Sequence, residues 1–129
     1  MTDQAPQSVT ILVVEGEDGV RAMITRALRE AGYHVLEASD GVLALAVVLA
    51  YKAKIDLLVA DIIMTNIGGL QLAERLTVEG KHPIFLFMTG YDQDWSEVAG
   101  SGLNKPFGSG EIVAEVRRPL SQVEPPHQA

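Results

Sequence analysis

The stretch Leu57-Leu-Val-Ala-Asp61 is an apolar run that ends at an acidic residue. Three further runs end at a polar residue in the same way, the last of them very short: Val9–Val14 before Glu15, Ile84–Met88 before Thr89, and Gly102–Asn104 before Lys105. Uninterrupted apolar runs are typical of strands covered on both faces, and the stretches between them have helical spacing. This alternation predicts a parallel sheet with right-handed crossovers.

The four residues that follow these runs are expected to meet, because parallel strands place their carboxyl ends along one edge of the sheet. Glu15 and Asp61 supply carboxylate oxygens, which Mg²⁺ prefers as ligands, and the Lys105 ammonium pairs well with phosphate. Thr89 adds a hydroxyl that can donate to a phosphoryl oxygen. A carboxylate can also attack phosphorus to form an acyl phosphate. The pattern therefore predicts a site for a divalent cation and a phosphoryl group.

The rest of the chain fits the same alternation. We expect long helices at residues 20–31, 41–52, 69–79 and 110–120, at most two helical turns within 92–100, and strands at 9–14, 33–38, 57–61, 84–88 and 102–104. Asp40 is the expected N-cap of the second helix, and Gly32 is placed to end the first. Four residues of the third helix are expected to face inward, namely Leu70, Ala73, Leu76 and Thr77.

Composition and charge narrow the class of protein. The 129 residues suit one domain, and 47% hydrophobic but only 5% aromatic residues predict a core of Val, Leu, Ile and Ala. A formal charge of −7 opposes binding to nucleic acid or to an anionic membrane. The chain has no cysteine and no apolar stretch long enough to span a bilayer, so we expect a cytoplasmic protein. Residues 1–8 are expected to form a flexible leader and 121–129 a disordered tail.

Four stretches resemble one known family when they are taken in order. They read Ile11-Leu-Val-Val-Glu15, Leu57-Leu-Val-Ala-Asp61-Ile-Ile-Met64, Phe87-Met-Thr89-Gly-Tyr91 and Asn104-Lys-Pro-Phe107. Over residues 9–120 the chain resembles the receiver domains of bacterial two-component response regulators. The resemblance implies an α/β, flavodoxin-like (βα)5 three-layer sandwich with the strand order 2-1-3-4-5. Because only fifteen residues separate Thr89 from Lys105, we expect a shortened or irregular fourth helix.

The resemblance also implies a role for each site residue. Asp61 would be the phosphoacceptor, charged by a sensor histidine kinase or a phosphotransfer protein in a Mg²⁺-dependent reaction. Thr89 and Lys105 would bind the phosphoryl group, and the bond from Lys105 to Pro106 is expected to be cis, although only about 5% of X-Pro bonds are. A stand-alone receiver of this kind is no enzyme beyond its own phosphorylation and dephosphorylation, and it signals through a downstream protein partner.

The metal site departs from the family pattern. The resemblance gives its ligands as Glu15, Asp61 and the backbone carbonyl of Ile63, with Glu17 as a further candidate. Gly16 stands where the family has the second member of an acidic pair. Affinity for divalent ions depends strongly on the number of charged ligands, so we expect Mg²⁺ binding that is weakened but not abolished.

Other departures lie in parts of the family that move. Gly68 replaces a loop acid, and Gly102 replaces an aromatic switch residue. A switch and partner surface is still expected, formed by Tyr91, Trp95, Pro106 and Phe107. We also expect the segment 91–101 to be the most mobile part of the domain.

Three alternatives remain open at this point. The helix at 41–52 is apolar all round, so an outward stripe of Leu43, Val47 and Ala50 would be covered by a partner or by a second copy in a homodimer. The glycine departures favour a pseudo-receiver, an interaction module that no longer depends on phosphate. A flavin-binding domain shares the topology, but the chain has no phosphate-cradling loop after its first strand.

Overall fold

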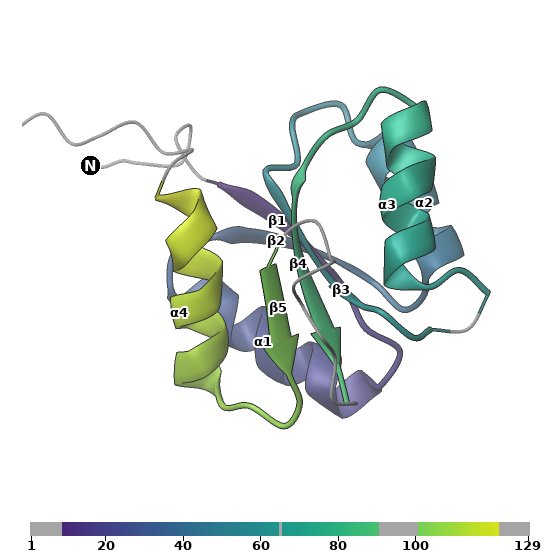
Figure 1. The fold of residues 1–129 in the computed structure, drawn as a ribbon. Helices are drawn as coiled ribbons and strands as arrows, with labels where there is room; N and C mark the ends of the chain where they lie inside the picture. Colours follow the sequence, from purple (N-terminus) through teal and green to yellow (C-terminus); the bar gives the residue numbers. More distant parts are fainter. Residues whose placement is uncertain (1–8, 65, 91–100, 122–129) are drawn as a thin grey trace, which may run out of the picture.

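The domain is built on one sheet of five parallel strands (Figure 1). The computed structural model describes residues 9–64, 66–90 and 101–121. Within them the strands pair in the order β2-β1-β3-β4-β5, which confirms the predicted topology. The strands are β1 (Thr10–Val14), β2 (His34–Ala38), β3 (Leu57–Asp61), β4 (Ile84–Thr89) and β5 (Ser101–Asn104).

Two layers of helices cover the sheet. The described helices are α1 (Asp18–Glu30), α2 (Gly41–Ala50), α3 (Gly69–Val78) and α4 (Ser109–Leu120). Figure 1 shows α1 and α4 on one face of the sheet and α2 and α3 on the other. The expected short fourth helix falls in residues 91–100, outside the described residues, as do the leader and all of the tail after Ser121.

Strands β1 and β3 form the centre of the sheet and are buried along their whole length. Alternate side chains of a strand point to opposite faces, so one central strand serves both layers. Ile11 and Val13 of β1 pack under α1 and α4, whereas Leu12 and Val14 pack under α2 and α3. This is why the central strands are continuous apolar runs. The edge strand β2 leaves His34 and Glu37 exposed.

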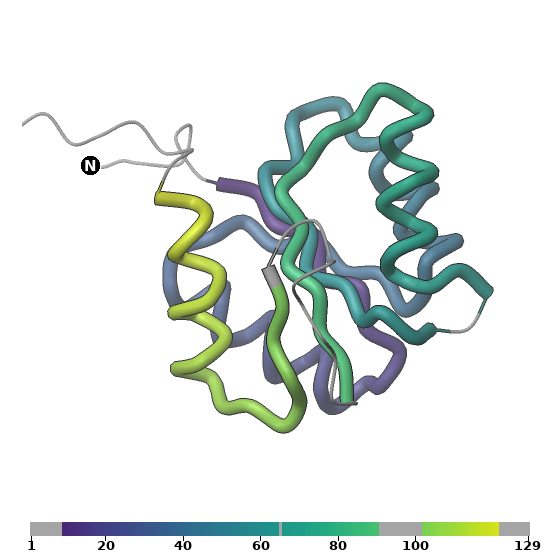
Figure 2. Tube along the Cα trace, viewed as in Figure 1, coloured from purple at the N-terminus to yellow at the C-terminus, as the bar shows by residue number. Residues whose placement is uncertain are grey.

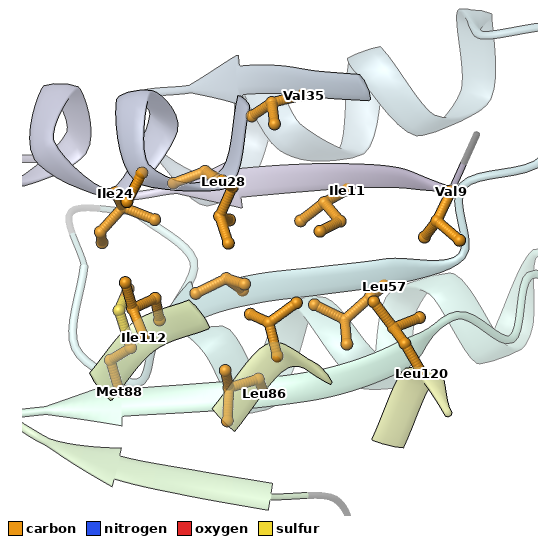
Figure 3. Close-up of a cluster of buried hydrophobic side chains, with 14 residues drawn as sticks. Val9, Ile11, Ile24, Leu28, Val35, Leu57, Leu86, Met88, Ile112 and Leu120 are labelled. Carbon is orange, nitrogen blue, oxygen red and sulfur yellow. The ribbon is translucent and has the colours of Figure 1, made fainter. Parts of the chain in front are cut away.

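The core under α1 and α4 joins both helices to the sheet (Figure 3). Ile24 and Leu28 of α1 and Ile112 of α4 are fully buried there against Leu57 and Leu86 of the strands. Burial of each such side chain stabilises the fold by about 1.5–3 kcal/mol. The packing fixes α1 over β1, and with it the turn that carries Glu15.

Both expected helix boundaries are confirmed by hydrogen bonds. Asp40 is the N-cap of α2, where its Oδ1 accepts from Leu43 N at 2.8 Å. Gly32 follows α1 with φ +102°, and the amides of Gly32 and Tyr33 donate to carbonyls of the last turn of α1. This is the left-handed ending that glycine adopts without steric cost.

The expected inward face of α3 was wrong for Leu70 and Thr77, whereas Leu76 is buried as predicted and Ala73 is half-buried. Leu72 and Leu76 are fully buried, whereas Leu70 is 41% exposed and Thr77 is exposed. The reason lies at Gly69, where a Cβ atom would stand 2.6 Å from the carbonyl oxygen of Asp61. This close backbone approach turns Gly69 toward the sheet, so residues three and seven positions later follow it inward.

Helix α2 is apolar on its outer face as well. Ala44 and Val48 are buried, while Val42, Leu43 and Leu49 are 46–50% exposed. Leu43 therefore faces outward as predicted. In the expected outward stripe, Ala50 is exposed too, but Val47 is half-buried. None of the helices in the described part of the chain has the length and apolar character needed to cross a bilayer.

Candidate functional site

The polar residues at the strand ends meet around the side chain of Lys105. Its Nζ lies 2.6 Å from Asp61 Oδ2 and 2.8 Å from Glu15 Oε1. Glu15 follows β1, Asp61 ends β3 and Lys105 follows β5, so the sheet alone brings them together. Figure 2 shows β4 and β5 ending at the same side of the molecule. The predicted convergence is confirmed for these three residues.

Asp61 is held on both of its carboxylate oxygens. Oδ2 accepts from Lys105 Nζ, and Oδ1 accepts from the backbone amide of Ile63 at 3.1 Å. The residue is only 8% exposed. These contacts align the carboxylate at the edge of the sheet, and the charge-assisted hydrogen bond from Lys105 replaces part of the water that burial removes.

Glu15 is more deeply buried, at 2% exposure. Its Oε2 accepts from the amide of Glu17 at 2.9 Å. Its Oε1 forms an ion pair with Lys105 Nζ at 2.8 Å, and no other described residue donates to it. A buried carboxylate oxygen is costly unless it is paired with a positive charge, and the Lys105 ammonium supplies that charge here.

Lys105 is anchored from its backbone as well as from its side chain. Its amide donates to the carbonyl of Thr89 at 2.8 Å, next to the pairing of Thr89 with Asn104. The bond from Lys105 to Pro106 is cis, as predicted. Burial lowers the pKa of Lys105, but the hydrogen bonds and charges of Asp61 and Glu15 outweigh it and raise the pKa above its usual range. The ammonium is therefore a fixed positive charge.

Thr89 stands beside the Asn104–Lys105 segment at the same edge of the sheet. It is the last residue of β4 and only 1% exposed. Its register partner in β5 is Asn104, the residue before Lys105. Thr89 and Lys105 therefore reach the site from neighbouring strands, as expected.

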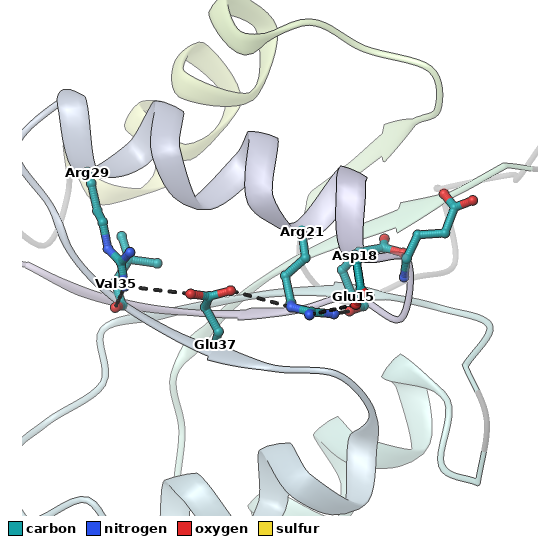
Figure 4. A network of polar contacts seen from close by, with 7 residues as sticks. Glu15, Asp18, Arg21, Arg29, Val35 and Glu37 are labelled. Atoms are coloured by element: carbon teal, nitrogen blue, oxygen red, sulfur yellow. Dashed lines mark hydrogen bonds and ion pairs between the residues drawn. The ribbon is translucent and has the colours of Figure 1, made fainter.

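A network that the sequence reasoning missed holds the turn after β1 (Figure 4). Arg21 donates to the carbonyl of Glu15 and to Asp18 Oδ1, both at 2.8 Å, and its Nε lies 3.4 Å from Glu37 Oε1. Arg29 lies 3.7 Å from the other oxygen of Glu37. Arg21 is 19% exposed, so its contact with the Glu15 backbone is partly shielded from water. Two arginines eight residues apart share one helix face, which was the available signal.

The glycine departures differ in their structural meaning. At Gly16, a Cβ atom would stand 3.5 Å from the carbonyl oxygen of Ser39, an ordinary contact, so a side chain fits. At Gly68, a Cβ atom would stand 2.4 Å from the carbonyl oxygen of Ile62, so no side chain fits without a backbone shift. Gly68 is thus required by the loop after Asp61, whereas position 16 has room for a side chain.

The other expected site residues are placed as follows. Ile63 is 58% exposed beside the site. Glu17 is exposed, and no group of three or more acidic, histidine or cysteine side chains with the makings of a metal site occurs in the described parts of the chain. Pro106 is exposed and Phe107 packs against the core under α1 and α4. Tyr91 and Trp95 lie outside the described residues.

The comparisons with known proteins give one family. The family model for the response regulator receiver domain matches residues 11–117. The chain is 32% identical over 121 residues to the sensor kinase CckA of Brucella abortus. The alignment covers 89% of the present chain but only 13% of CckA. It is also 35% identical over 124 residues to the response regulator MprA of Mycobacterium bovis. That alignment covers 92% of the present chain and 53% of MprA.

Solved structures agree with the sequence matches. A crystal structure of the receiver domain of the hybrid histidine kinase CckA superimposes with a TM-score of 0.76 and 36% identity, covering 86% of this chain and 98% of that one. The regulator TrrA of Thermotoga maritima, solved in complex with Mg²⁺–BeF, superimposes with a TM-score of 0.74 and 28% identity, covering 85% of this chain and 97% of that one.

Proposed function

The chain belongs to the family of response regulator receiver domains, and on that premise we propose that Asp61 is its phosphoacceptor. The domain takes part in two-component signalling. A sensor histidine kinase or a phosphotransfer protein supplies the phosphoryl group, and a downstream protein reads the result. We place this reaction in the cytoplasm and expect no role for nucleic acid, given the charge of −7.

One observation carries the proposal: the Asp61 carboxylate stands at the sheet edge with the Lys105 ammonium 2.6 Å from one of its oxygens. In the proposed reaction an Asp61 oxygen attacks phosphorus in line, the bond from phosphorus to the donor imidazole breaks, and the imidazole leaves with a proton. Lys105 then pairs with the transferred phosphoryl oxygens. Thr89, at the end of the neighbouring strand β4, would donate its hydroxyl to them.

The residues present fit a divalent cation. Glu15 and Asp61 bring two carboxylates to one point of the sheet edge, where an oxygen of each lies within 2.8 Å of the same ammonium. The hydroxyl, carboxylate and carbonyl oxygens of this edge match the ligands that Mg²⁺ takes, and the ion would neutralise charge on the phosphoryl group. Glu15, Asp61 and the Ile63 carbonyl would hold it. With Gly16 in place of a third acid, we propose that the metal site is weaker than in most of the family.

A specific observation also supports the pseudo-receiver as a second candidate. Lys105 already contacts both carboxylates, so the ion cluster is satisfied without metal or phosphate. A cluster of this kind favours one arrangement of the side chains at the sheet edge. An interaction module needs such a fixed surface to bind its partner.

Intact-mass measurement separates the two candidates. The protein is incubated with acetyl phosphate and Mg²⁺, and in parallel with a histidine kinase that has been autophosphorylated with ATP. The proposal expects an adduct of one phosphoryl group in the wild type and none in Asp61→Asn. If neither donor yields an adduct that depends on Asp61, the pseudo-receiver is the better account.

A further inference from the structure

A second concave surface lies at the opposite edge of the sheet from Asp61. It is a pocket of about 500 Å³ formed by the segment before β3 and the segment before β4. Its walls carry four basic side chains, and Val48 and Ile55 form part of its apolar lining. We call it the lysine pocket, after Lys52, Lys54 and Lys81, which line it together with His82. Its volume is within the range of small-molecule sites.

The distribution of lysine makes this pocket unusual for an acidic protein. The formal charge is −7, and the sequence contains four lysines in all. Lys105 serves the site at the carboxyl edge, and the other three line this pocket. Positive charge gathered in one concave place raises the local concentration of anions, even on a protein of negative net charge.

The ammonium groups of the pocket form few contacts that would stabilise the folded domain. Lys52 and Lys81 form no ion pair with any other residue in the described ranges. Lys54 has only a distant contact, 3.9 Å from Asp56 Oδ1. The other oxygen of Asp56 accepts from the amide of Thr10 at 2.9 Å, which ties that carboxylate to the start of β1.

Nor is Lys81 needed to cap α3, the helix that precedes it. Lysines often follow helices because they neutralise the free carbonyls of the last turn. Here backbone amides already serve those carbonyls at α3: Gly80 N donates to Thr77 O at 3.0 Å, and Lys81 N donates to Leu76 O at 2.8 Å.

The floor of the pocket adds a second requirement for the ligand. Val48 and Ile55 are 5% and 8% exposed, and the half-buried Pro83 stands at the rim. A ligand that fits both features has several negative charges for the lysines and an apolar body for the floor. We propose that the lysine pocket binds a small polyanion that carries a ring system, the chemical class of nucleoside diphosphates and triphosphates. This site is independent of phosphoryl transfer to Asp61.

Calorimetric titration of the full chain with ADP, in buffer that contains EDTA, tests the proposal. We expect saturable binding with one ADP per chain and with a sub-millimolar dissociation constant. The double substitution Lys52→Gln and Lys81→Gln should weaken the affinity at least about tenfold, because both charges act on the same phosphates. Adenosine should bind at least about tenfold more weakly than ADP.

Two control variants make the result specific. Arg117→Gln with Arg118→Gln removes the same charge from the exposed last turn of α4, and should leave ADP affinity within about twofold. Lys105→Gln should also leave it unchanged, because Lys105 lies at the other edge of the sheet. The proposal is overturned if ADP does not saturate, if the lysine and arginine variants weaken binding equally, or if Lys105→Gln abolishes it. Binding of an acidic peptide but not of ADP would also overturn it.

Discussion

Replacing Gly16 by aspartate should restore a strong metal site, and the size of the effect can be worked out. The cluster at the sheet edge has two carboxylates, Glu15 and Asp61, and one ammonium. A third carboxylate about 5 Å from a divalent ion contributes about 1.7 kcal/mol in water, and physiological salt lowers this to about 1 kcal/mol. The dissociation constant for Mg²⁺ should therefore fall about five- to twentyfold.

The substitution should not disturb the fold. The nearest atom to a Cβ at Gly16 is the Ser39 carbonyl oxygen at 3.5 Å, and the residue is exposed. Without metal, the added charge repels Glu15, so we expect a small loss of stability that Mg²⁺ reverses by binding only the folded state. Calorimetric titration with Mg²⁺ gives the affinity, and urea unfolding with and without Mg²⁺ gives the stability.

The matched control is Gly19→Asp in the first turn of α1. A Cβ there has no neighbour within 4 Å, and the charge change is the same. Gly16→Asn adds a side chain without charge. If Gly16→Asp binds Mg²⁺ no more tightly than Gly19→Asp does, the reasoning that assigns the weak site to one missing carboxylate is refuted.

Three further predictions concern the fold and the ion cluster. Thr25 is 3% exposed and its hydroxyl has no hydrogen-bond partner among the described residues, so Thr25→Val should raise the free energy of unfolding by about 1 kcal/mol in urea titrations; a loss would contradict this. Leu72→Ala should cost about 2–5 kcal/mol and Leu70→Ala less than about 1 kcal/mol, and equal costs would contradict the observed face of α3. The pKa of Lys105 is raised in the folded state, so folding makes the ammonium hold its proton more tightly. The stability that the charged Lys105 contributes is therefore complete below the unfolded pKa of 10.5 and is lost as the pH rises through the folded pKa. In urea titrations from pH 9 to 12, the difference in the free energy of unfolding between the wild type and Lys105→Gln should narrow above pH 10.5. A difference that stays constant over this range would contradict the contribution of the Lys105 charge.

The convergence of the site could be predicted because it depends only on strand ends. A buried parallel strand appears in the sequence as an apolar run, and the residue after it lies at the edge of the sheet where the strands have their carboxyl ends. Glu15, Asp61 and Lys105 needed no further information to be brought together. The order of the strands came instead from the resemblance to a family, since apolar runs alone do not say which strands are neighbours.

The face of α3 could not be predicted because its pattern supports two stripes. Leu70 and Leu72 are both apolar, and helical spacing permits either to face inward. The choice is made by the backbone contact between Gly69 and Asp61, which involves no side chain and leaves no periodic signal. The network of Arg21 was missed for a different reason: its partners include a backbone carbonyl, which every sequence has.

The net charge of the cluster at the sheet edge suggests a second consequence of Gly16, besides the loss of one metal ligand. In the resting protein two carboxylates face one ammonium, so the cluster has one net negative charge. If Asp61 carries a phosphoryl group, as proposed, that group brings about two negative charges beside Glu15 and Lys105. One divalent ion then makes the cluster neutral, whereas an additional acid at position 16 would leave it negative. A neutral cluster is the cheapest to hold in a partly buried place. Gly16 therefore weakens metal binding before transfer more than after it, and the metal should bind the phosphorylated form more tightly than the free form.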